Sequence, residues 1–327
     1  MSRLRIGFIG AGGIARRHLE NLLHFDDVQI TAIADPLLDR AQNLAGRAGA
    51  YAFRDSQEML DREGLDALYI CVPPFAHGAP EQQALEHRLP FFVEKPLATD
   101  LKIAEDIATR VEAADVITAA GYHWRYLDTT EQVQELLRDN PARLAIGYWL
   151  DQTPPPAWWV KQAESGGQMI EQTTHIFDLM RLLVGDVTEV FGAGSRAMRQ
   201  DFPNADVCDV STATLRFKEG AVGSVSSTCL LRWPHRIGLH LFAEGLAIEL
   251  TEFEVIVDAG RGRSARASQG DPFVREDRDF IDAVQGKTNR IRSPYREALC
   301  SHRIATAVTQ SAHERKPVLL QTEAVSG

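Results

Sequence analysis

The sequence predicts a two-part protein: an α/β domain with a doubly wound parallel sheet, followed by an α+β domain with an open, mainly antiparallel mixed sheet. Up to about residue 122, strand-like apolar runs alternate with helical patterns. After residue 125, strand-like runs follow one another closely and are separated by turn signals such as Lys218-Glu219-Gly220. A chain of 327 residues is also too long for one compact core. We therefore expect domains at 1–122 and 123–327.

In the first domain, strands are expected where short apolar runs rich in β-branched and aromatic residues stop at glycine, proline or acid. Helices are expected where apolar residues recur with a period of 3.6. The predicted strands are 4–9, 28–34, 67–72, 91–94 and 116–121. The predicted helices are 14–25, 37–48, 79–88 and 101–114.

The same criteria apply to the second domain. Strands are predicted at 144–150, 187–193, 210–217, 221–231, 237–243, 247–250 and 254–258. Helices are predicted at 127–138, 169–184, 273–284 and 295–314. The basic cluster Arg261, Arg263 and Arg266 is expected to be a solvated loop, with phosphate binding as the alternative.

Composition excludes several classes of function. The net charge of −10 argues against non-specific binding to nucleic acid or to an anionic membrane. No apolar run approaches the roughly 20 residues that cross a bilayer, and the amino terminus enters a strand at once, so no secretory signal is expected. The four cysteines are scattered, which suits free thiols in a reducing cytoplasm and makes structural zinc unlikely to be present.

The first predicted strand runs into a glycine-rich turn. Gly10 allows a tight turn, Gly12 lets the backbone approach a pyrophosphate, and Ala15 permits close packing of helix on strand. Together with Gly13 and Ile14 they form a G-x-G-x-x-A fingerprint at a strand-to-helix junction, where the helix N-terminus attracts phosphate. The alternative is an ordinary tight turn. In this position the pattern predicts dinucleotide binding.

The second predicted strand ends in Asp35-Pro36. An acid about 20 residues after the glycines is where this motif binds the hydroxyls of the adenosine ribose. Asp35 would repel a 2′-phosphate, and Pro36 has no N–H to offer one, so we expect NAD(H), with NADP(H) as the alternative because Arg40 lies nearby. Asp35 could equally cap the helix that follows.

A second strand end carries a lysine. The apolar run Phe91-Phe92-Val93 stops at Glu94-Lys95, followed by proline. Ligands of open parallel sheets bind at the carboxyl ends of the strands, so Lys95 is a candidate for chemistry. The alternative is a solvated strand end followed by a helix that begins at proline.

A third constellation lies in the second domain. Glu171, His175 and Asp178 recur at i, i+4 and i+7 of the predicted helix 169–184 and would share one face. An imidazole held by a carboxylate can act as a general base. The alternatives are an exposed ion pair, which contributes little, and a metal site, for which no third ligand is seen at regular spacing.

These residues resemble the glucose–fructose oxidoreductase / inositol dehydrogenase / MocA (Gfo/Idh/MocA) family of nicotinamide-dependent oxidoreductases. The matching segments are Gly10-Ala11-Gly12-Gly13-Ile14, Ala34-Asp35-Pro36, Tyr69-Ile70-Cys71-Val72-Pro73 with His77, Glu94-Lys95-Pro96, Gly121-Tyr122 before Arg125, and Gly166-Gly167 before Glu171, His175 and Asp178. The resemblance covers nearly the whole chain. It implies a Rossmann domain, a site in the cleft between the domains, and a homodimer or homotetramer formed through the C-terminal sheet.

The resemblance also implies roles for residues. Lys95 would contact the cofactor and the reacting hydroxyl, and His175 would take the hydroxyl proton. Glu171 stands where many members carry aspartate, so it would either touch substrate or orient His175. The expected cofactor contacts are Gly10, Gly12, Gly13, Ile14, Asp35, Arg40, Val72, Pro73, His77, Glu94, Lys95 and Arg125.

Substrate contacts are expected from residues that follow the first strand of the second domain. Aromatic faces with nearby carboxylates suit sugar rings, although tryptophan is equally a core residue. The candidates are Trp149, Asp151, Trp158, Trp159 and, on the predicted helix, Asp178.

The sequence thus predicts a cytoplasmic NAD(H)-dependent oxidoreductase that acts on a secondary alcohol, or the matching ketone, of a sugar, inositol or related polyol. No metal is expected. One alternative is a dinucleotide-binding regulatory protein of the same fold that has lost turnover. Another keeps the enzyme but changes its chemistry to reduction of an imine or a conjugated double bond.

Overall fold

The computed structural model describes residues 3–321, and within them the chain forms two compact units. The first unit comprises residues up to 123 together with 271–299. The second comprises 124–270 and the residues from 300 onward. The predicted division at 122/123 falls one residue from the first crossing. The return of 271–299 to the first unit was not predicted, because a helical period does not say which core a helix joins.

The first unit is built on a six-stranded sheet in the order β3-β2-β1-β4-β5-β6. Every pair is parallel, so the carboxyl ends of all six strands lie at one edge. The strands are β1 (Leu4–Ile9), β2 (Val28–Ala34), β3 (Tyr51–Phe53), β4 (Ala67–Ile70), β5 (Phe91–Val93) and β6 (Thr118–Ala120). The strand order reverses between β1 and β4, which is where this class of sheet binds ligands.

Helices cover both faces of this sheet, and each face has its own apolar core. Such burial explains the nearly continuous apolar character of the strands. The helices between strands are α1 (Gly13–Leu22), α2 (Leu38–Ala48), α3 (Ser56–Arg62), α4 (Ala79–Glu86) and α5 (Leu101–Ala114), with a 3₁₀ turn η1 (Pro74–Ala76) after β4.

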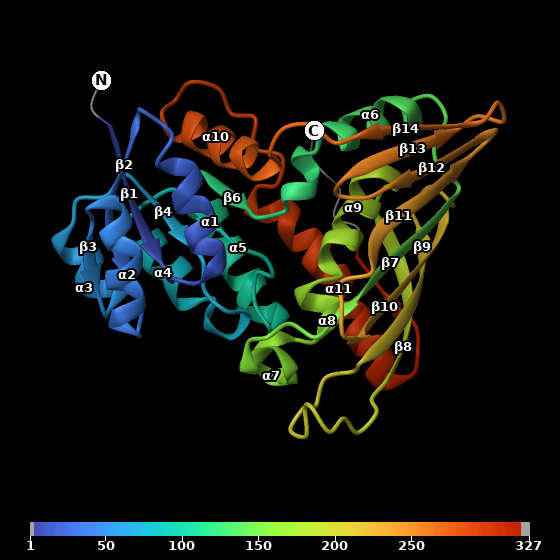
Figure 1. Ribbon diagram of the computed structural model, residues 1–327, viewed down its shortest axis with the longest axis horizontal. Helices are drawn as coiled ribbons and strands as arrows, with labels where there is room; N and C mark the ends of the chain where they lie inside the picture. The colour runs from blue at the N-terminus through green and yellow to red at the C-terminus, as the bar shows by residue number, and fades with distance from the viewer. Residues whose placement is uncertain (1–2, 322–327) are drawn as a thin grey trace. The chain divides into compact units, whose positions relative to one another are not determined.

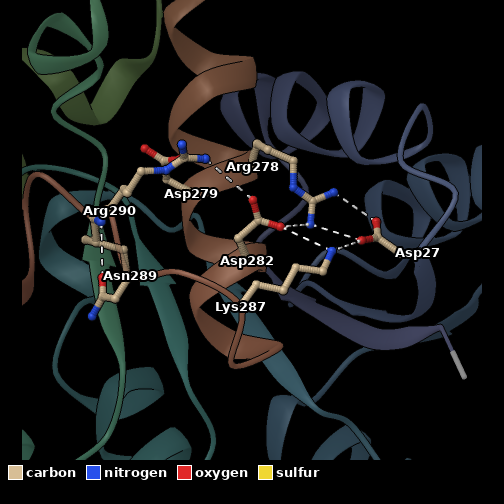
Figure 2. Close-up of polar contacts among 8 residues, drawn as sticks. Asp27, Arg278, Asp279, Asp282, Lys287, Asn289 and Arg290 are labelled. Carbon is tan, nitrogen blue, oxygen red and sulfur yellow. Dashed lines mark hydrogen bonds and ion pairs between the residues drawn. The ribbon is translucent and has the colours of Figure 1, made fainter. Parts of the chain in front are cut away.

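The returning segment supplies α10 (Pro272–Val284) and the first turn of α11 (Tyr295–Glu314). Phe280 and Ile281 of α10 are fully buried in the core beneath α1. At the rim, Arg278 donates to both oxygens of Asp27 at 2.9 and 3.1 Å, and Lys287 lies 3.0 Å from the same carboxylate (Figure 2). Apolar burial and this ion network both fix α10 beside the loop that precedes β2.

The second unit contains a nine-stranded sheet in the order β14-β13-β12-β11-β7-β10-β9-β8-β15. Only β7 and β10 pair in parallel, so the sheet is mixed and mainly antiparallel, as predicted. Its strands are β7 (Leu144–Gln152), β8 (Val187–Ser195), β9 (Val210–Phe217), β10 (Val222–Leu231), β11 (Arg236–Ala243), β12 (Leu246–Leu250), β13 (Glu254–Asp258), β14 (Arg263–Ala267) and β15 (Val318–Leu319).

Helices pack on one face of that sheet and leave the other face open (Figure 1). The covering helices are α6 (Asp128–Leu137), α8 (Gln168–Glu171), α9 (Thr174–Val184) and the later part of α11. Short turns η2 (His123–Tyr126), η3 (Ala157–Val160) and α7 (Gln162–Ser165) complete the unit. Along β7, Ala145 and Gly147 face the helices, whereas Leu144 and Ile146 are exposed on the open face.

Several predicted elements need correction. The expected helix 169–184 is two helices, because the Thr173 N–H bonds to the Gln168 carbonyl five residues back and adds a residue to that turn. The expected loop around Arg263 and Arg266 is the edge strand β14. The short elements β3, α3 and β15 were not predicted. Among residues 3–321, none of the helices is both long enough and apolar enough to span a membrane.

Candidate functional site

The residues predicted to bind a dinucleotide gather at the carboxyl edge of the first unit's sheet. Gly10 follows β1, Asp35 follows β2, and Glu94 and Lys95 follow β5. All of these strands are parallel, so their ends share one edge. Lys95 is half-buried there, and Glu94 is buried. The parallel sheet therefore brings together Gly10, Asp35 and Lys95, which follow different strands and lie far apart in the sequence.

The first glycine of the fingerprint has different surroundings from the other two. Gly10 has φ +97°, and a Cβ there would lie 2.3 Å from the carbonyl oxygen of Cys71. This glycine is required by the fold itself. A Cβ at Gly12 or at Gly13 would meet no described atom within 4 Å. Neither is required by packing, so the open space beside them is free for a ligand.

The N-terminus of α1 suits an anion. Its N-cap is Gly12, no described side chain caps it, and its first turn contains no acid. The loop is held from β2, because one oxygen of Asp35 accepts the Ala11 N–H at 2.9 Å and the other accepts the Leu37 N–H at 2.8 Å. The N-cap of α2 is Leu37, so the capping alternative for Asp35 is wrong. An uncapped helix end in a held glycine loop fits a pyrophosphate.

The other predicted cofactor contacts of this unit lie nearby in the chain. Ile14 is in the first turn of α1, and Arg40 is exposed on α2. Val72 and Pro73 follow β4 and are half-buried. His77 is buried, and its Nδ1 lies 2.5 Å from Glu81, whose other oxygen accepts the Gly78 N–H at 2.6 Å. Their contacts with a cofactor remain predictions.

Glu94 is held by a buried histidine. The Nε2 of His18, on α1, lies 3.0 Å from Oε1 of Glu94, and the Nδ1 of His18 lies 2.7 Å from Asp277 on α10. The second oxygen of Glu94 accepts the Lys95 N–H at 3.1 Å. The second oxygen of Asp277 accepts an N–H of Asn21 at 2.8 Å. A continuous chain of polar contacts thus runs from α10 to Lys95.

Glu276 adds a third acid to this cluster. Its side chain is buried, and neither carboxyl oxygen has a hydrogen-bond partner among the described residues. Burial raises the pKa of Glu276 well above its ordinary value, which favours the neutral acid. His18, Glu94 and Glu276 are also the one group of described residues whose histidine and carboxylate atoms lie close enough together for a metal ion, within 4.8 Å.

The second unit places His175 under an aromatic ring. His175 is buried in the first turn of α9, and its ring is stacked on that of Trp149 with centroids 5.8 Å apart. Glu171 ends α8, and its carboxylate accepts the indole N–H of Trp159 at 2.7 Å. The helix is interrupted between Glu171 and His175, and the shared face expected for the two side chains stays a prediction. Burial of His175 also rules out the exposed ion pair.

Arg125 and Asp178 form a buried pair in the second unit. The Arg125 guanidinium donates to both oxygens of Asp178, at 2.8 and 2.7 Å. Ser301 donates to the same carboxylate at 2.6 Å. Paired in this way, the two charges stabilise one another in the interior. The cofactor contact expected of Arg125 and the substrate contact expected of Asp178 remain predictions.

The remaining candidate substrate residues follow β7 or lie within it. Trp149 and Asp151 are half-buried strand residues, and an oxygen of Asp151 accepts the Gln152 N–H at 2.7 Å. Trp158 packs against a small apolar cluster that includes Trp159 and Cys229. Their roles toward a substrate remain predictions.

Sequence reasoning missed two residues that hold the site, and for a third it missed the contact. His18 holds Glu94 and is itself held by Asp277, and Trp159, a candidate substrate contact, holds Glu171. A signal was available for the first two: His18 and Asp277 are polar residues at positions where the period of α1 and α10 calls for apolar ones. Such residues need partners.

Comparisons with known proteins agree with this architecture. A family model described as "Oxidoreductase family, NAD-binding Rossmann fold" matches residues 4–122, and one described as "GFO/IDH/MocA C-terminal domain" matches residues 142–261. Myo-inositol 2-dehydrogenase of Thermotoga maritima is 30% identical over 231 residues, which are 69% of this chain and 68% of that protein.

Two further relatives extend the likeness. The scyllo-inositol 2-dehydrogenase (NAD(+)) of Bacillus subtilis is 30% identical over 244 residues, covering 72% of this chain and 70% of that protein. A solved structure of levoglucosan dehydrogenase in complex with NADH superimposes with a TM-score of 0.87 at 20% identity, over 98% of this chain and 100% of that one. At that identity the superposition establishes the fold.

Proposed function

The chain belongs to the GFO/IDH/MocA family of oxidoreductases, and from this premise we propose that it transfers hydride between NAD(H) and a secondary alcohol or ketone of a sugar, inositol or related polyol. The observation that carries the proposal is the position of Lys95, which follows β5 at the same sheet edge as the glycine turn after β1. A cationic side chain at this edge is suited to act beside a bound dinucleotide.

We assign the proton chemistry to residues of the chain. The bound nicotinamide supplies the hydride acceptor for oxidation and the hydride donor for reduction. In oxidation, the hydroxyl proton must leave as the C–H bond breaks, and His175 in its neutral form accepts it. The Lys95 ammonium stabilises the negative charge that develops on the oxygen. The Trp149 ring stacked on His175 favours the imidazolium that results.

Glu171 is proposed as a positioning residue. Its carboxylate is held by the indole N–H of Trp159, so it presents a fixed negative charge at the end of α8. A fixed carboxylate near the start of α9 would favour the charged form of His175 after proton transfer. We also propose substrate contacts from Trp149, Asp151 and Trp158.

Alanine variants of Lys95 and His175 test the proposal. With a panel of polyols and saturating NAD, each variant is expected to lower kcat by about 10²-fold or more, while the Kd for NADH is largely unchanged. Lys102→Ala, an exposed lysine paired with Asp106, and His235→Ala, an exposed histidine, are matched controls. Near-wild-type rates for both site variants would contradict the assignment.

Assays of the wild-type protein separate the proposed enzyme from a regulatory protein of the same fold. Tight NADH binding with no turnover of any polyol by the wild-type protein would favour a dinucleotide sensor. Incorporation of label from reduced cofactor into an imine or alkene, with no reaction of ketones, would keep the enzyme and change its reaction. The expected result is label in the alcohol product.

We propose NAD(H) as the preferred cofactor. Asp35 is buried at the end of β2, where its two carboxylate oxygens accept backbone N–H groups. An anion there repels a 2′-phosphate. Arg40 is the residue that could favour NADP(H), and it is exposed on α2.

We further propose a cytoplasmic homodimer or homotetramer that assembles through the open face of the second unit's sheet. Leu144, Ile146 and Val222 are exposed there by 37–46%. Exposed apolar patches of this kind favour association. Light scattering on the wild type and on Ile146→Asp tests this: the variant is expected to be smaller, and a wild-type monomer would contradict the proposal. The thiols of Cys71, Cys208 and Cys229 are free, which suits a reducing compartment.

A further inference from the structure

The contacts of His18 favour its charged form. Each ring nitrogen lies within hydrogen-bond distance of a carboxylate, Asp277 at 2.7 Å and Glu94 at 3.0 Å. Each of these carboxylates also accepts an N–H on its other oxygen, from Asn21 and from the backbone of Lys95. Two carboxyl groups on opposite ring nitrogens favour the imidazolium, in which both nitrogens donate.

Other groups around His18 agree with this charge. Tyr69 of β4 stacks at a tilt with a centroid distance of 5.4 Å, and Phe92 of β5 lies at 4.8 Å. Glu276 on α10 is a further titratable group beside the ring, with a carboxyl oxygen within 4.8 Å of a His18 nitrogen. The two paired carboxylates outweigh burial and raise the pKa of His18 well above its ordinary value.

The Glu94 carboxylate is also confined sterically. A Cβ at Gly121, the residue after β6, would lie 2.4 Å from Oε1 of Glu94. The carboxylate therefore fits only because glycine follows β6. His18 holds it on one side, Gly121 leaves room on the other, and its second oxygen holds the Lys95 N–H.

We propose that His18, gripped by Asp277, is a positioning residue for Lys95: it fixes the Glu94 carboxylate, and Glu94 fixes the backbone from which the lysine side chain extends. The inference rests on the proposed function, since it matters for turnover only if Lys95 acts on the substrate. A displacement of about 1 Å in a catalytic group can lower the rate by about 10²-fold. The return of α10 to the first unit then matters for the site, because α10 carries Asp277, which holds His18.

Two variants disturb the contacts of the Glu94 carboxylate by independent means. His18→Gln replaces the cation with an amide that can donate to one carboxylate only. Gly121→Ala leaves every charge in place and displaces the Glu94 carboxylate. Each is expected to lower kcat by about 10-fold or more with little change in KM or in the Kd for NADH. Leu22→Ala is the matched control, since it removes a buried apolar side chain from α1 without touching the cluster.

Measurements that need no turnover complete the test. Hydrogen exchange of the amides at 92–95 is expected to speed up by about 10-fold or more in both variants and to remain unchanged in Leu22→Ala. Nitrogen NMR of histidine-labelled wild type is expected to find both nitrogens of His18 protonated at neutral pH. A neutral His18, or a divalent metal bound to its Nε2 in the purified protein, would overturn the inference.

The outcomes separate this inference from the proposed function. If Lys95→Ala is inactive while His18→Gln and Gly121→Ala keep wild-type kcat and exchange, the positioning role is wrong and the proposed reaction stands. If Lys95→Ala is fully active, the role proposed for Lys95 in the reaction is wrong, and exchange and NMR still decide whether His18 holds the strand end. Equal losses of kcat in Leu22→Ala and His18→Gln would mean that lost stability accounts for both.

Discussion

The two glycines of the phosphate turn should respond to the same substitution in opposite ways. Gly12 has φ −80°, which alanine adopts, and its new Cβ would meet no described atom within 4 Å. As an N-cap, alanine is less favourable than glycine, at a cost below about 1 kcal/mol. Gly12→Ala should therefore fold normally. Its methyl group would occupy the space proposed for the pyrophosphate, so the Kd for NADH should rise at least about tenfold, or about 1.4 kcal/mol.

Gly10→Ala should fail for a different reason. At φ +97° a Cβ carries the left-handed penalty of about 1–2 kcal/mol. The same Cβ would lie 2.3 Å from the Cys71 carbonyl oxygen and 2.8 Å from its carbon, and backbone atoms cannot turn aside. Overpacking of this kind costs about 1–3 kcal/mol. Loss of folding free energy of about 2–5 kcal/mol is expected before any ligand is added.

Urea unfolding without ligand and NADH titration by fluorescence measure the two effects separately. Gly46→Ala in α2 is the control, since it too has open space but lies in a helix away from the turn, where alanine favours folding. If Gly12→Ala loses stability as Gly10→Ala does, the space beside Gly12 is not open. If Gly12→Ala binds NADH as tightly as the wild type, the pyrophosphate does not lie there.

Three further predictions follow from single contacts. Asp35→Ala should narrow the preference for NAD over NADP in kcat/KM, because it removes the anion that repels a 2′-phosphate, and an unchanged ratio would contradict the ribose role. Arg278 holds the pKa of Asp27 below its ordinary value of 3.8, so the pair stabilises the fold above that pH and loses its effect as the pH falls through the lowered pKa. Asp27→Asn should therefore lower the free energy of unfolding by about 0.5–1 kcal/mol at pH 7, with a smaller deficit at pH 2, which lies below the ordinary pKa; equal deficits at both would refute the linkage. Trp159→Phe removes the N–H that Glu171 accepts and should lower kcat with little change in the thermal midpoint. A loss of kcat accompanied by a clear fall in the midpoint would assign Trp159 to packing alone.

The sequence predicted best those elements whose burial is uniform. The bounds of β1 and β2 were predicted as observed, because each is a buried apolar run that stops at a residue with a distinct role, Gly10 or Asp35. The three-residue strand β3 was missed because it pairs on one side only and has little apolar length. Helix α3 was missed although Asp55 caps it by accepting the Glu58 N–H, a signal that the sequence displays.

The site was harder to predict because it depends on distant parts of the chain. Local spacing predicted one continuous helix through Glu171 and His175, but the chain forms two helices that are separated at Thr173. Lys95 was found because a strand end is a local feature. Its supports, His18 and Asp277, are separated by most of the sequence, and a helical period gives no indication that the two helices meet.

The order of synthesis makes the return of α10 consequential for how this protein matures. Phe280, Ile281 and Tyr295 belong to the cores of the first unit, yet the ribosome makes them after all of residues 124–270. A nascent chain released or paused before that point has a first unit in which Tyr69 and Phe92 still lack their contacts with Phe280. The first unit can therefore complete its core only after the residues of the second unit have been synthesised, and until then part of its apolar surface stays uncovered.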